Sequence, residues 1–229
     1  MRKQQKGTIE YRTPYHWEAR GVSRQIQIRR ARFAQKYIKA SDHVLDIGCG
    51  DGFLTNAISA FCQRVIGIDN SLTGISLARD RVDNAKVALL ISSASNLPFK
   101  DDTFDIITLF EVIEHIPAES VKNTVEEIKR VLKDGGKIIV TTPNSRNLQN
   151  IICRRRMVST KHEKEYSQAE LLRLLSDFEK IELSGIYLPL FPFTLLSKPR
   201  YRFIWQILFF LARYFPKFDR FITYCGRKK

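Results

Sequence analysis

Short apolar runs alternate with amphipathic stretches along the middle of the chain. Five runs rich in Val, Ile and Leu have the length of buried strands, at 43–47, 64–68, 87–92, 104–110 and 137–142. Three stretches with helical spacing lie between them, at 53–61, 71–82 and 120–132. Near-continuous apolar strands that alternate with helices are typical of a parallel sheet covered on both faces. We therefore predict an α/β fold with a doubly wound, mostly parallel sheet.

Further patterns flank this core. Residues 17–39 place apolar side chains at helical spacing, which predicts an N-terminal helix with a basic outer face. A capping box of Ser167 and Glu170 starts an expected helix over 168–175. Two further strands, at 178–186 and 221–226, would complete a seven-stranded sheet, with an apolar helix inserted at about 200–215. We expect one domain over 1–229, with a basic helical cap at 1–40, a core at 41–145 and a C-terminal segment at 146–229.

Charge is unevenly distributed along the chain. The net charge is +14; residues 1–39 carry eleven Lys and Arg against two acids, residues 40–150 eleven against fifteen, and residues 198–229 nine against one. This distribution predicts that the basic ends meet an anionic partner such as a membrane surface, RNA or an acidic substrate. The basic start has no apolar run behind it, and the four cysteines lack metal-binding spacing. We therefore expect no signal peptide, free thiols and an intracellular, cytoplasmic protein.

The loop after the first expected strand combines glycines with carboxylates. In the stretch VLDIGCGDGF, a dinucleotide fingerprint would need a third glycine where Phe53 stands. Asp46 and Asp51 flank the two remaining glycines, Gly48 and Gly50. A phosphate beside these carboxylates would be repelled, at about 4 kcal/mol per pair at 4 Å. The turn therefore favours a ligand that is cationic or uncharged.

A further acid follows the second expected strand. Asp69 ends the run RVIGID, nineteen residues after Gly50, and Asn70 stands beside it. A carboxylate at this strand tip can accept hydrogen bonds from both hydroxyls of a ribose. S-adenosylmethionine has a ribose, a positive sulfonium and no phosphate, so it meets both requirements.

Four blocks carry a family resemblance. VLDIGCGDGFLT, VIGIDNS, SSASNLPFKDDTFDIITLFEVIEHI and VLKDGGKIIVTTPN stand in the order and spacing of class I S-adenosylmethionine-dependent methyltransferases. They most resemble the branch with ubiquinone- and menaquinone-type small-molecule methyltransferases, over about residues 15–185. The resemblance implies a Rossmann-like methyltransferase fold, with the cofactor bound by 41–145 and the substrate side formed by 146–229. The cofactor residues it implies are Asp46, Gly48, Cys49 and Gly50 at the methionine end, Asp69 and Asn70 at the ribose, Ser93 and Ala94 at the adenine, and Phe110 on the pocket floor.

Ser93 departs from the family pattern. Relatives usually have an Asp-Ala pair where this chain has Ser93 and Ala94, and the aspartate accepts from the adenine amino group. A serine hydroxyl accepts only a neutral hydrogen bond, roughly half as strong as a charge-assisted one. We expect adenine binding that is weaker or differently arranged.

His115 is the candidate catalytic residue. It lies in EVIEHIP, just past the fourth expected strand, where an imidazole suits a general base if the acceptor loses a proton. The alternative is that His115 only caps or packs the loop. Glu111, Glu114 and His115 also resemble an ExxEH stretch that some quinone-pathway members use with a divalent cation. Because the stretch is common in the family without a metal, we predict no metal site.

Two absent motifs and the composition of the C-terminal tail narrow the class of methyl acceptor. No N/D/S-P-P-aromatic motif follows the fourth expected strand and no Pro-Cys pair marks a cytosine C5 nucleophile, which disfavours methylation of nucleic-acid bases. The longest uncharged apolar run of the tail, 203–212, is ten residues long, about half of what a bilayer span needs. Cations flank this run: Lys198, Arg200 and Arg202 before it, and Arg213, Lys217 and Arg220 after it. Such a segment is typical of a helix at a membrane interface; a core helix or a dimer surface are the alternatives.

We therefore expect an S-adenosylmethionine-dependent methyltransferase that O-methylates a small or lipid-linked acceptor near a membrane surface. The N-terminal helix, residues 154–164 and the tail would cover the acceptor. An RNA-associated methyltransferase or RNA-binding module is the first alternative, and a non-catalytic partner that binds S-adenosylmethionine is the second. The sequence leaves the acceptor and the oligomeric state open.

Overall fold

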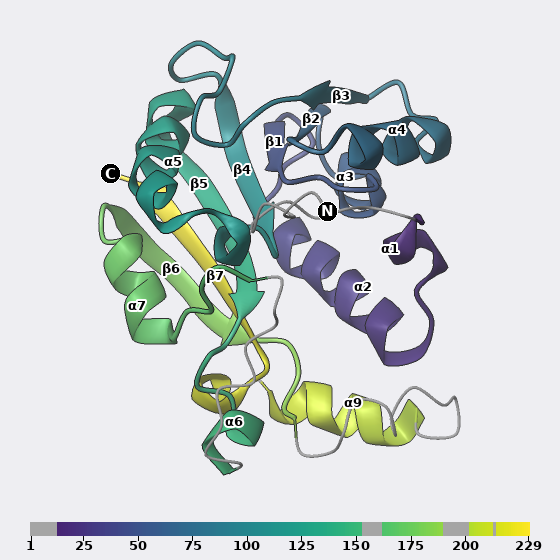
Figure 1. Ribbon diagram of the computed structural model, residues 1–229, viewed down its shortest axis with the longest axis vertical. Coiled ribbons are helices and arrows are strands. Elements are labelled where there is room, and N and C mark those ends of the chain that lie inside the picture. The colour runs from purple at the N-terminus through teal and green to yellow at the C-terminus, as the bar shows by residue number, and fades with distance from the viewer. Residues whose placement is uncertain (1–12, 153–161, 190–201, 213) are drawn as a thin grey trace, which may run out of the picture.

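A seven-stranded sheet forms the centre of the protein in the computed structural model, which describes residues 13–152, 162–189, 202–212 and 214–229 (Figure 1). The strands are β1 (His43–Ile47), β2 (Arg64–Asp69), β3 (Val87–Ile91), β4 (Phe104–Phe110), β5 (Leu132–Pro143), β6 (Phe178–Gly185) and β7 (Phe221–Lys228). Their order is β3-β2-β1-β4-β5-β7-β6. Strands β1 to β5 pair in parallel, and β7 is antiparallel to both β5 and β6. The predicted doubly wound, mostly parallel sheet is confirmed.

Helices cover both faces of this sheet (Figure 1). The described helices are α1 (Tyr15–Glu18), α2 (Gly21–Gln35), α3 (Phe53–Ser59), α4 (Leu72–Arg81), α5 (Ala118–Val131), α6 (Leu148–Ile152), α7 (Gln168–Leu174) and α9 (Arg202–Leu211), with 3-10 turns η1 (Ile113–His115) and η3 (Pro216–Phe218). Buried side chains of α2 and α3, such as Phe33 and Ile58, form one core cluster with the sheet. Side chains of α5 and α7, such as Ile128 and Leu171, form a second cluster. The two clusters fix the layered fold, because each buries one face of the sheet.

Two helices replace the single N-terminal helix predicted over 17–39. The backbone is extended at Ala19 and Arg20, and Gly21 has a φ of 58°, so the chain turns between α1 and α2. The predicted basic outer face of α2 is only partly present. Arg32 is exposed, but Arg30 is 4% exposed and faces the interior.

Strand β5 begins earlier than the predicted 137, at Leu132. The prediction extended the preceding helix through residue 132, whereas the helix ends at Val131 and Leu132 pairs with Phe104 of β4. A register shift between Phe104 and Ile106 accommodates the extra residues. The local pattern favoured a helix here, and the pairing with β4 overrides it.

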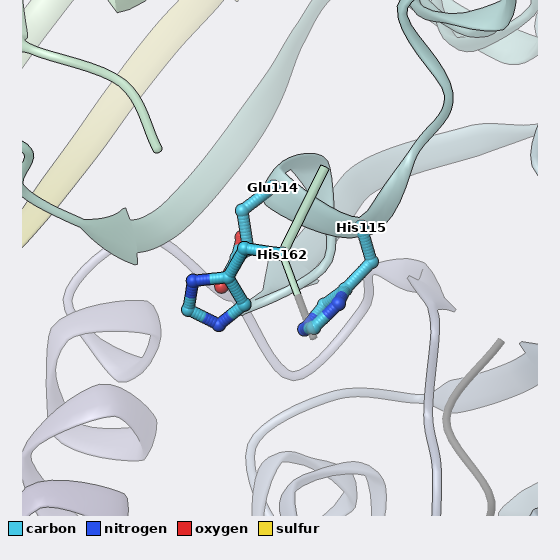
Figure 2. Close-up of side chains that lie close together, drawn as sticks. All are labelled: Glu114, His115 and His162. Carbon is cyan, nitrogen blue, oxygen red and sulfur yellow. The ribbon is translucent and has the colours of Figure 1, made fainter. Parts of the chain in front are cut away.

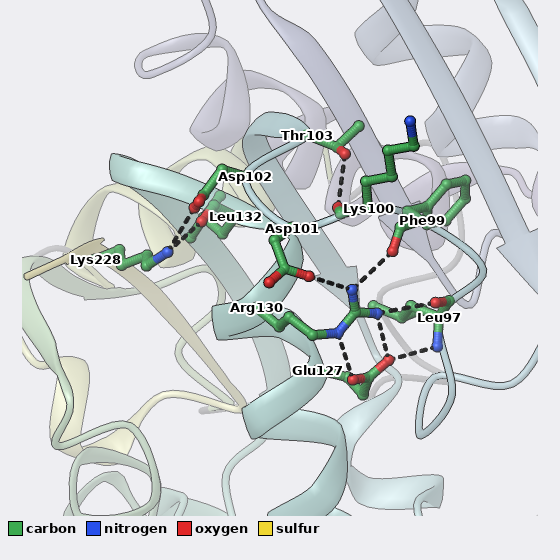
Figure 3. Close-up of polar contacts among 10 residues, drawn as sticks. All are labelled: Leu97, Phe99, Lys100, Asp101, Asp102, Thr103, Glu127, Arg130, Leu132 and Lys228. Carbon is green, nitrogen blue, oxygen red and sulfur yellow. Dashed lines mark hydrogen bonds and ion pairs between the residues drawn. The ribbon is translucent and has the colours of Figure 1, made fainter.

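The loop between β3 and β4 is tied to α5 by Arg130 (Figure 3). Its guanidinium donates to Glu127, to Asp101 and to the carbonyl oxygens of Leu97 and Phe99, over 2.7–3.0 Å. One side chain thereby satisfies several polar groups of a segment without regular structure. The loop that follows the candidate adenine residues is thus fixed against the core.

Helix α9 is buried on one side only. Trp205, Leu208 and Phe209 pack in a core cluster with Val22 and Ile26 of α2. The opposite side carries exposed apolar residues: Phe203, Ile207 and Phe210, with exposed fractions of 72%, 41% and 55%. Three of the predicted flanking cations, Lys198, Arg200 and Arg213, lie outside the described residues. Within the described ranges, no helix combines the length and the apolar composition needed to cross a membrane.

Candidate functional site

A tight turn follows β1 and crosses the tip of β2. The amides of Gly48 and Cys49 donate to the carbonyl oxygen of Ile68, at 2.7 and 2.9 Å. Gly48 has a φ of 70°, and a Cβ there would lie 2.4 Å from Cγ2 of Val112. Only glycine fits this conformation and this contact. The turn therefore brings bare backbone to the carboxyl end of the sheet, where ligands of such folds bind.

Asp69 is held beside this turn. Its carboxylate is buried and accepts from the amides of Gly50, at 2.9 Å, and Ser71, at 2.8 Å. Burial raises the pKa of Asp69, and the amide hydrogen bonds act in the opposite direction. Each carboxylate oxygen has a second lone pair for a further donor. The predicted ribose acceptor is thus fixed in place at the tip of β2.

Asp46 is anchored by two threonines. Its carboxylate accepts from the hydroxyls of Thr55 and Thr108, each at 2.6 Å, and is 1% exposed. Burial raises the pKa of Asp46 to about 6, although the threonine hydrogen bonds lower it. Asp46 therefore remains mostly ionised at neutral pH and contributes negative charge to the cavity wall.

Asp51 anchors the N-terminal segment. Its carboxylate accepts from the backbone amide of His16 at 2.8 Å and lies 3.0 Å from His16 Nδ1. The indole nitrogen of Trp17 donates to the backbone carbonyl of Asp51 at 2.7 Å, and its ring packs edge-on against Phe53. The sequence predicted that Asp46 and Asp51 would both favour a cationic ligand. In the structure the carboxylate of Asp51 already interacts with His16 of α1, so Asp46 is the one left for the ligand.

A cavity of about 170 Å³ opens beside the turn. Its lining combines the turn, the end of β4 and the N-terminal helices: His16, Gln27, Arg30, Asp46, Gly48, Cys49, Gly50, Asp51, Leu54, Phe110, Glu111 and His115. Six of the predicted site residues therefore lie together in this lining. Asp69 adjoins it through Gly50, whereas Asn70 and Ser93 are exposed and outside the lining, and Ala94 packs against a core cluster. The cavity is the place where the predicted cofactor and catalytic residues meet.

An ion pair forms part of the cavity wall. Arg30 of α2 lies 2.9 Å from Oε2 of Glu111, and Thr141 donates to Oε1 of Glu111 at 3.1 Å. Glu111 has a φ of 59°, an uncommon conformation for a residue with a side chain. Burial raises the pKa of Glu111, and the charge of Arg30 is the largest opposing influence. This pair fixes how α2 meets the end of β4.

Glu114, His115 and His162 form a second group beside the cavity (Figure 2). One ligand atom of each lies within 4.8 Å of the others. Glu114 is fully buried; burial and the nearby charge of Glu111 raise its pKa well above the usual value. The resemblance pointed to Glu111 as the third member of this group. In the structure Glu111 pairs with Arg30, and His162 takes its place.

Sequence reasoning missed three residues of this region. Arg30 follows Ile26 by four residues and precedes Phe33 by three, so its spacing already indicated the buried face of α2. His16 and His162 carry no comparable local signal. Both reach the site through contacts between segments far apart in the chain.

A family model matches the middle of the chain. Residues 45–140 match the model of the family described as "Methyltransferase domain". The match covers less than half of the chain. The matched residues include the turn, Asp69, Glu111, Glu114 and His115, whereas Arg30 and His162 lie outside them.

Relatives and solved structures extend the match. A demethylmenaquinone methyltransferase of Lactiplantibacillus plantarum is 36% identical over 118 residues, 48% of this chain and 49% of the relative. A probable S-adenosylmethionine-dependent methyltransferase of Mycobacterium tuberculosis is 30% identical over 146 residues, 63% of this chain and 51% of the relative. The chain thus spans about half the length of these curated relatives. The N-methyltransferase NodS of Bradyrhizobium japonicum, in complex with S-adenosyl-L-homocysteine, aligns with a TM-score of 0.68 at 14% identity, covering 95% of this chain and 93% of NodS. This likeness establishes the Rossmann-like methyltransferase fold.

Proposed function

We propose that the protein transfers a methyl group from S-adenosylmethionine to an oxygen atom of a small or lipid-linked acceptor at the cytoplasmic face of a membrane. The observation that carries this proposal is a cavity whose lining includes both the glycine turn and His115. This lining contains the groups expected for the methyl donor and a candidate base for the acceptor.

The groups around the turn suit S-adenosylmethionine. Gly48 and Gly50 present backbone without side chains, Asp69 offers acceptors for the ribose hydroxyls, and Asp46 adds negative charge near a sulfonium. Among the described residues, Arg30 is the only Lys or Arg in the cavity lining, and it is paired with Glu111. The charge distribution thus favours a cationic ligand over a phosphate. A relative named as S-adenosylmethionine-dependent supports the same cofactor.

The cavity also contains a group that can take a proton from the acceptor. A bound sulfonium donor supplies the methyl group and a neutral leaving group, so the protein mainly has to orient the acceptor and exclude water. A hydroxyl acceptor also has to lose its proton, and His115 is placed on the cavity wall to take it. Histidine is a common general base in enzymes that work near neutral pH. His115 is therefore the residue we expect to act as general base.

A methyl-labelling experiment tests the reaction. The purified protein is incubated with trideuteromethyl S-adenosylmethionine and with lipid, small-molecule and RNA fractions from the source cells. We expect S-adenosylhomocysteine and an O-linked label in an apolar or lipid fraction. The His115→Gln variant should be slower by about 10²–10⁴-fold while it still binds S-adenosylmethionine, and exposed His43→Gln should match the wild type. Label in RNA alone, or binding without S-adenosylhomocysteine formation, would contradict the proposal.

The exposed side of α9 supports a membrane location. Phe203 and Phe210 are exposed on α9, and Ile151 and Ile152 are exposed at the end of α6. Helices α6 and α9 lie at the same end of the molecule (Figure 1). The exposed cation Lys217 lies close by in sequence, in η3. Aromatic and apolar side chains beside cations favour the interface of an anionic bilayer.

Vesicle sedimentation tests this location. The wild type should pellet with vesicles that contain phosphatidylglycerol, and the Phe203→Ser/Phe210→Ser variant should lose at least about tenfold in partitioning, since each buried aromatic side chain contributes roughly 1.5–3 kcal/mol. Leu72→Ser is the matched control, because Leu72 is equally exposed, at 68%, on α4. Equal pelleting of all three proteins, or a wild-type dimer that the α9 variant dissociates, would exclude the membrane role for this surface.

A further inference from the structure

Two distant segments bring Glu114, His115 and His162 together. Glu114 and His115 belong to η1, directly after β4. The carbonyl oxygen of Glu114 accepts from the amides of Glu163, at 2.8 Å, and Lys164, at 3.2 Å, which places His162 beside η1. The rings of His115 and His162 meet edge-on with centroids 4.9 Å apart. The three side chains converge from these segments (Figure 2).

Glu114 has a buried oxygen without a partner. Its Oε2 accepts from the hydroxyl of Thr142 at 3.0 Å. Its Oε1 is also buried and has no hydrogen-bond partner. A buried polar atom left unsatisfied costs about 1–3 kcal/mol, and more when it is charged. A cation at Oε1 would remove this penalty.

His162 is oriented by a second carboxylate. Its Nδ1 lies 2.8 Å from Oε1 of Glu165, and both side chains are largely buried, at 16% and 6% exposure. Metal-binding histidines usually donate one ring N–H to a carboxylate, which directs the other nitrogen to the metal. In His162 this arrangement leaves Nε2 for an ion.

We propose that Glu114, His115 and His162 bind one divalent transition-metal ion. One carboxylate and two imidazoles are a ligand set that zinc and ferrous sites use. Their ligand atoms lie within 4.8 Å of one another, so coordination at about 2.0–2.2 Å needs a contraction of about 1 Å. Three protein ligands leave at least one coordination position of the ion open. In catalytic sites of this kind a water or the substrate occupies that position.

The position of the ion would give it a role in binding the methyl acceptor. His115 is also a wall of the cavity, so the ion would lie where the acceptor is expected. A metal ion orients a hydroxyl oxygen and lowers its pKa. This role rests on the proposed function and changes one part of it. With the ion bound, His115 would be a ligand, and the lowered pKa of the acceptor hydroxyl would replace the general base. Binding of the ion itself does not depend on the methyl acceptor.

Metal titration tests the site. Tag-free, full-length protein is stripped with a chelator and titrated calorimetrically with Zn²⁺, Mn²⁺ and Mg²⁺, without methyl donor or acceptor. We expect one ion per chain and affinity that falls from Zn²⁺ to Mn²⁺ to Mg²⁺, since imidazole ligands favour the transition metals. Glu114→Gln is isosteric, and His162→Gln changes a side chain that is partly exposed. Each should weaken Zn²⁺ binding more than tenfold. Glu165→Gln should weaken it by about 10–100-fold.

Two controls make the outcome decisive. His43→Gln removes an exposed histidine at the start of β1 and should leave Zn²⁺ binding unchanged. Zn²⁺ should raise the Tm of the wild type and of His43→Gln but not of Glu114→Gln. A cooperative melting transition of Glu114→Gln shows that this variant is folded, and its unchanged Tm shows that it has lost the site. No stoichiometric binding, or equal binding by Glu114→Gln and His162→Gln, would overturn the proposal. Binding with no detectable methyl transfer would instead leave the metal site intact and refute the proposed reaction.

Discussion

Replacing Asp69 by alanine should weaken the binding of S-adenosylmethionine about a hundredfold. Two ribose hydroxyls that donate to one carboxylate form charge-assisted hydrogen bonds, each contributing about 1.5–3 kcal/mol. Two such bonds at the lower limit correspond to about two factors of ten in Kd. The substitution also removes the acceptor for the amides of Gly50 and Ser71, which shape the turn. Calorimetric titration of the purified variant measures the change.

Asp80→Ala is the matched control for Asp69→Ala. Asp80 is exposed on α4, so the substitution removes the same charge without touching the turn. Its affinity should stay within about twofold of the wild type, because surface substitutions change free energies by at most about 0.5 kcal/mol. Asp69→Asn should fall between the two, since the amide oxygen accepts only neutral hydrogen bonds. Unchanged affinity in Asp69→Ala would remove the ribose assignment.

The central sheet was predictable because its signal is local. Strands β1 to β4 are short, almost wholly apolar segments, and their length and composition distinguish them from helices. The glycine turn was predictable for a similar reason, since Gly48 and Gly50 need backbone conformations that other residues rarely adopt. Strand boundaries that depend on pairing with a neighbouring strand were not predictable, as the early start of β5 at Leu132 shows.

The partners of the site residues were harder to predict. The sequence places Asp51 beside the turn, but it does not show that α1 returns to satisfy that carboxylate through His16. It places Glu114 and His115 after β4, but His162 reaches them only through backbone hydrogen bonds from a distant segment. Contacts of this kind depend on the tertiary fold, and no periodicity encodes them. Arg30 is different, because a helical projection of α2 would have shown a cation among apolar residues.

Replacing Arg30 by methionine should lower the free energy of unfolding by about 3–5 kcal/mol. The substitution keeps most of the apolar stem but leaves Glu111 without its counter-ion in a largely buried position. Removing one member of a buried ion pair is strongly destabilising, because the remaining charge stays desolvated. Arg30 also stacks over the ring of Phe221, 4.8 Å from its centroid, and donates to Gln27 at 3.2 Å. Urea denaturation of Arg30→Met gives the value directly.

A double-mutant cycle separates the charge from the packing. Glu111→Gln in the Arg30→Met background removes the unpaired carboxylate, so the double variant should regain part of the lost stability and the two substitutions should not be additive. Arg32→Met is the control on the same helix, where an exposed side chain should contribute no more than about 0.5 kcal/mol. If Arg30→Met and Arg32→Met are equally mild, Glu111 is neutral or hydrated in the native protein and the pair does not hold α2 to β4. If the loss is large but additive, Arg30 stabilises the site through its contacts with Phe221 and Gln27 and not through the charge of Glu111.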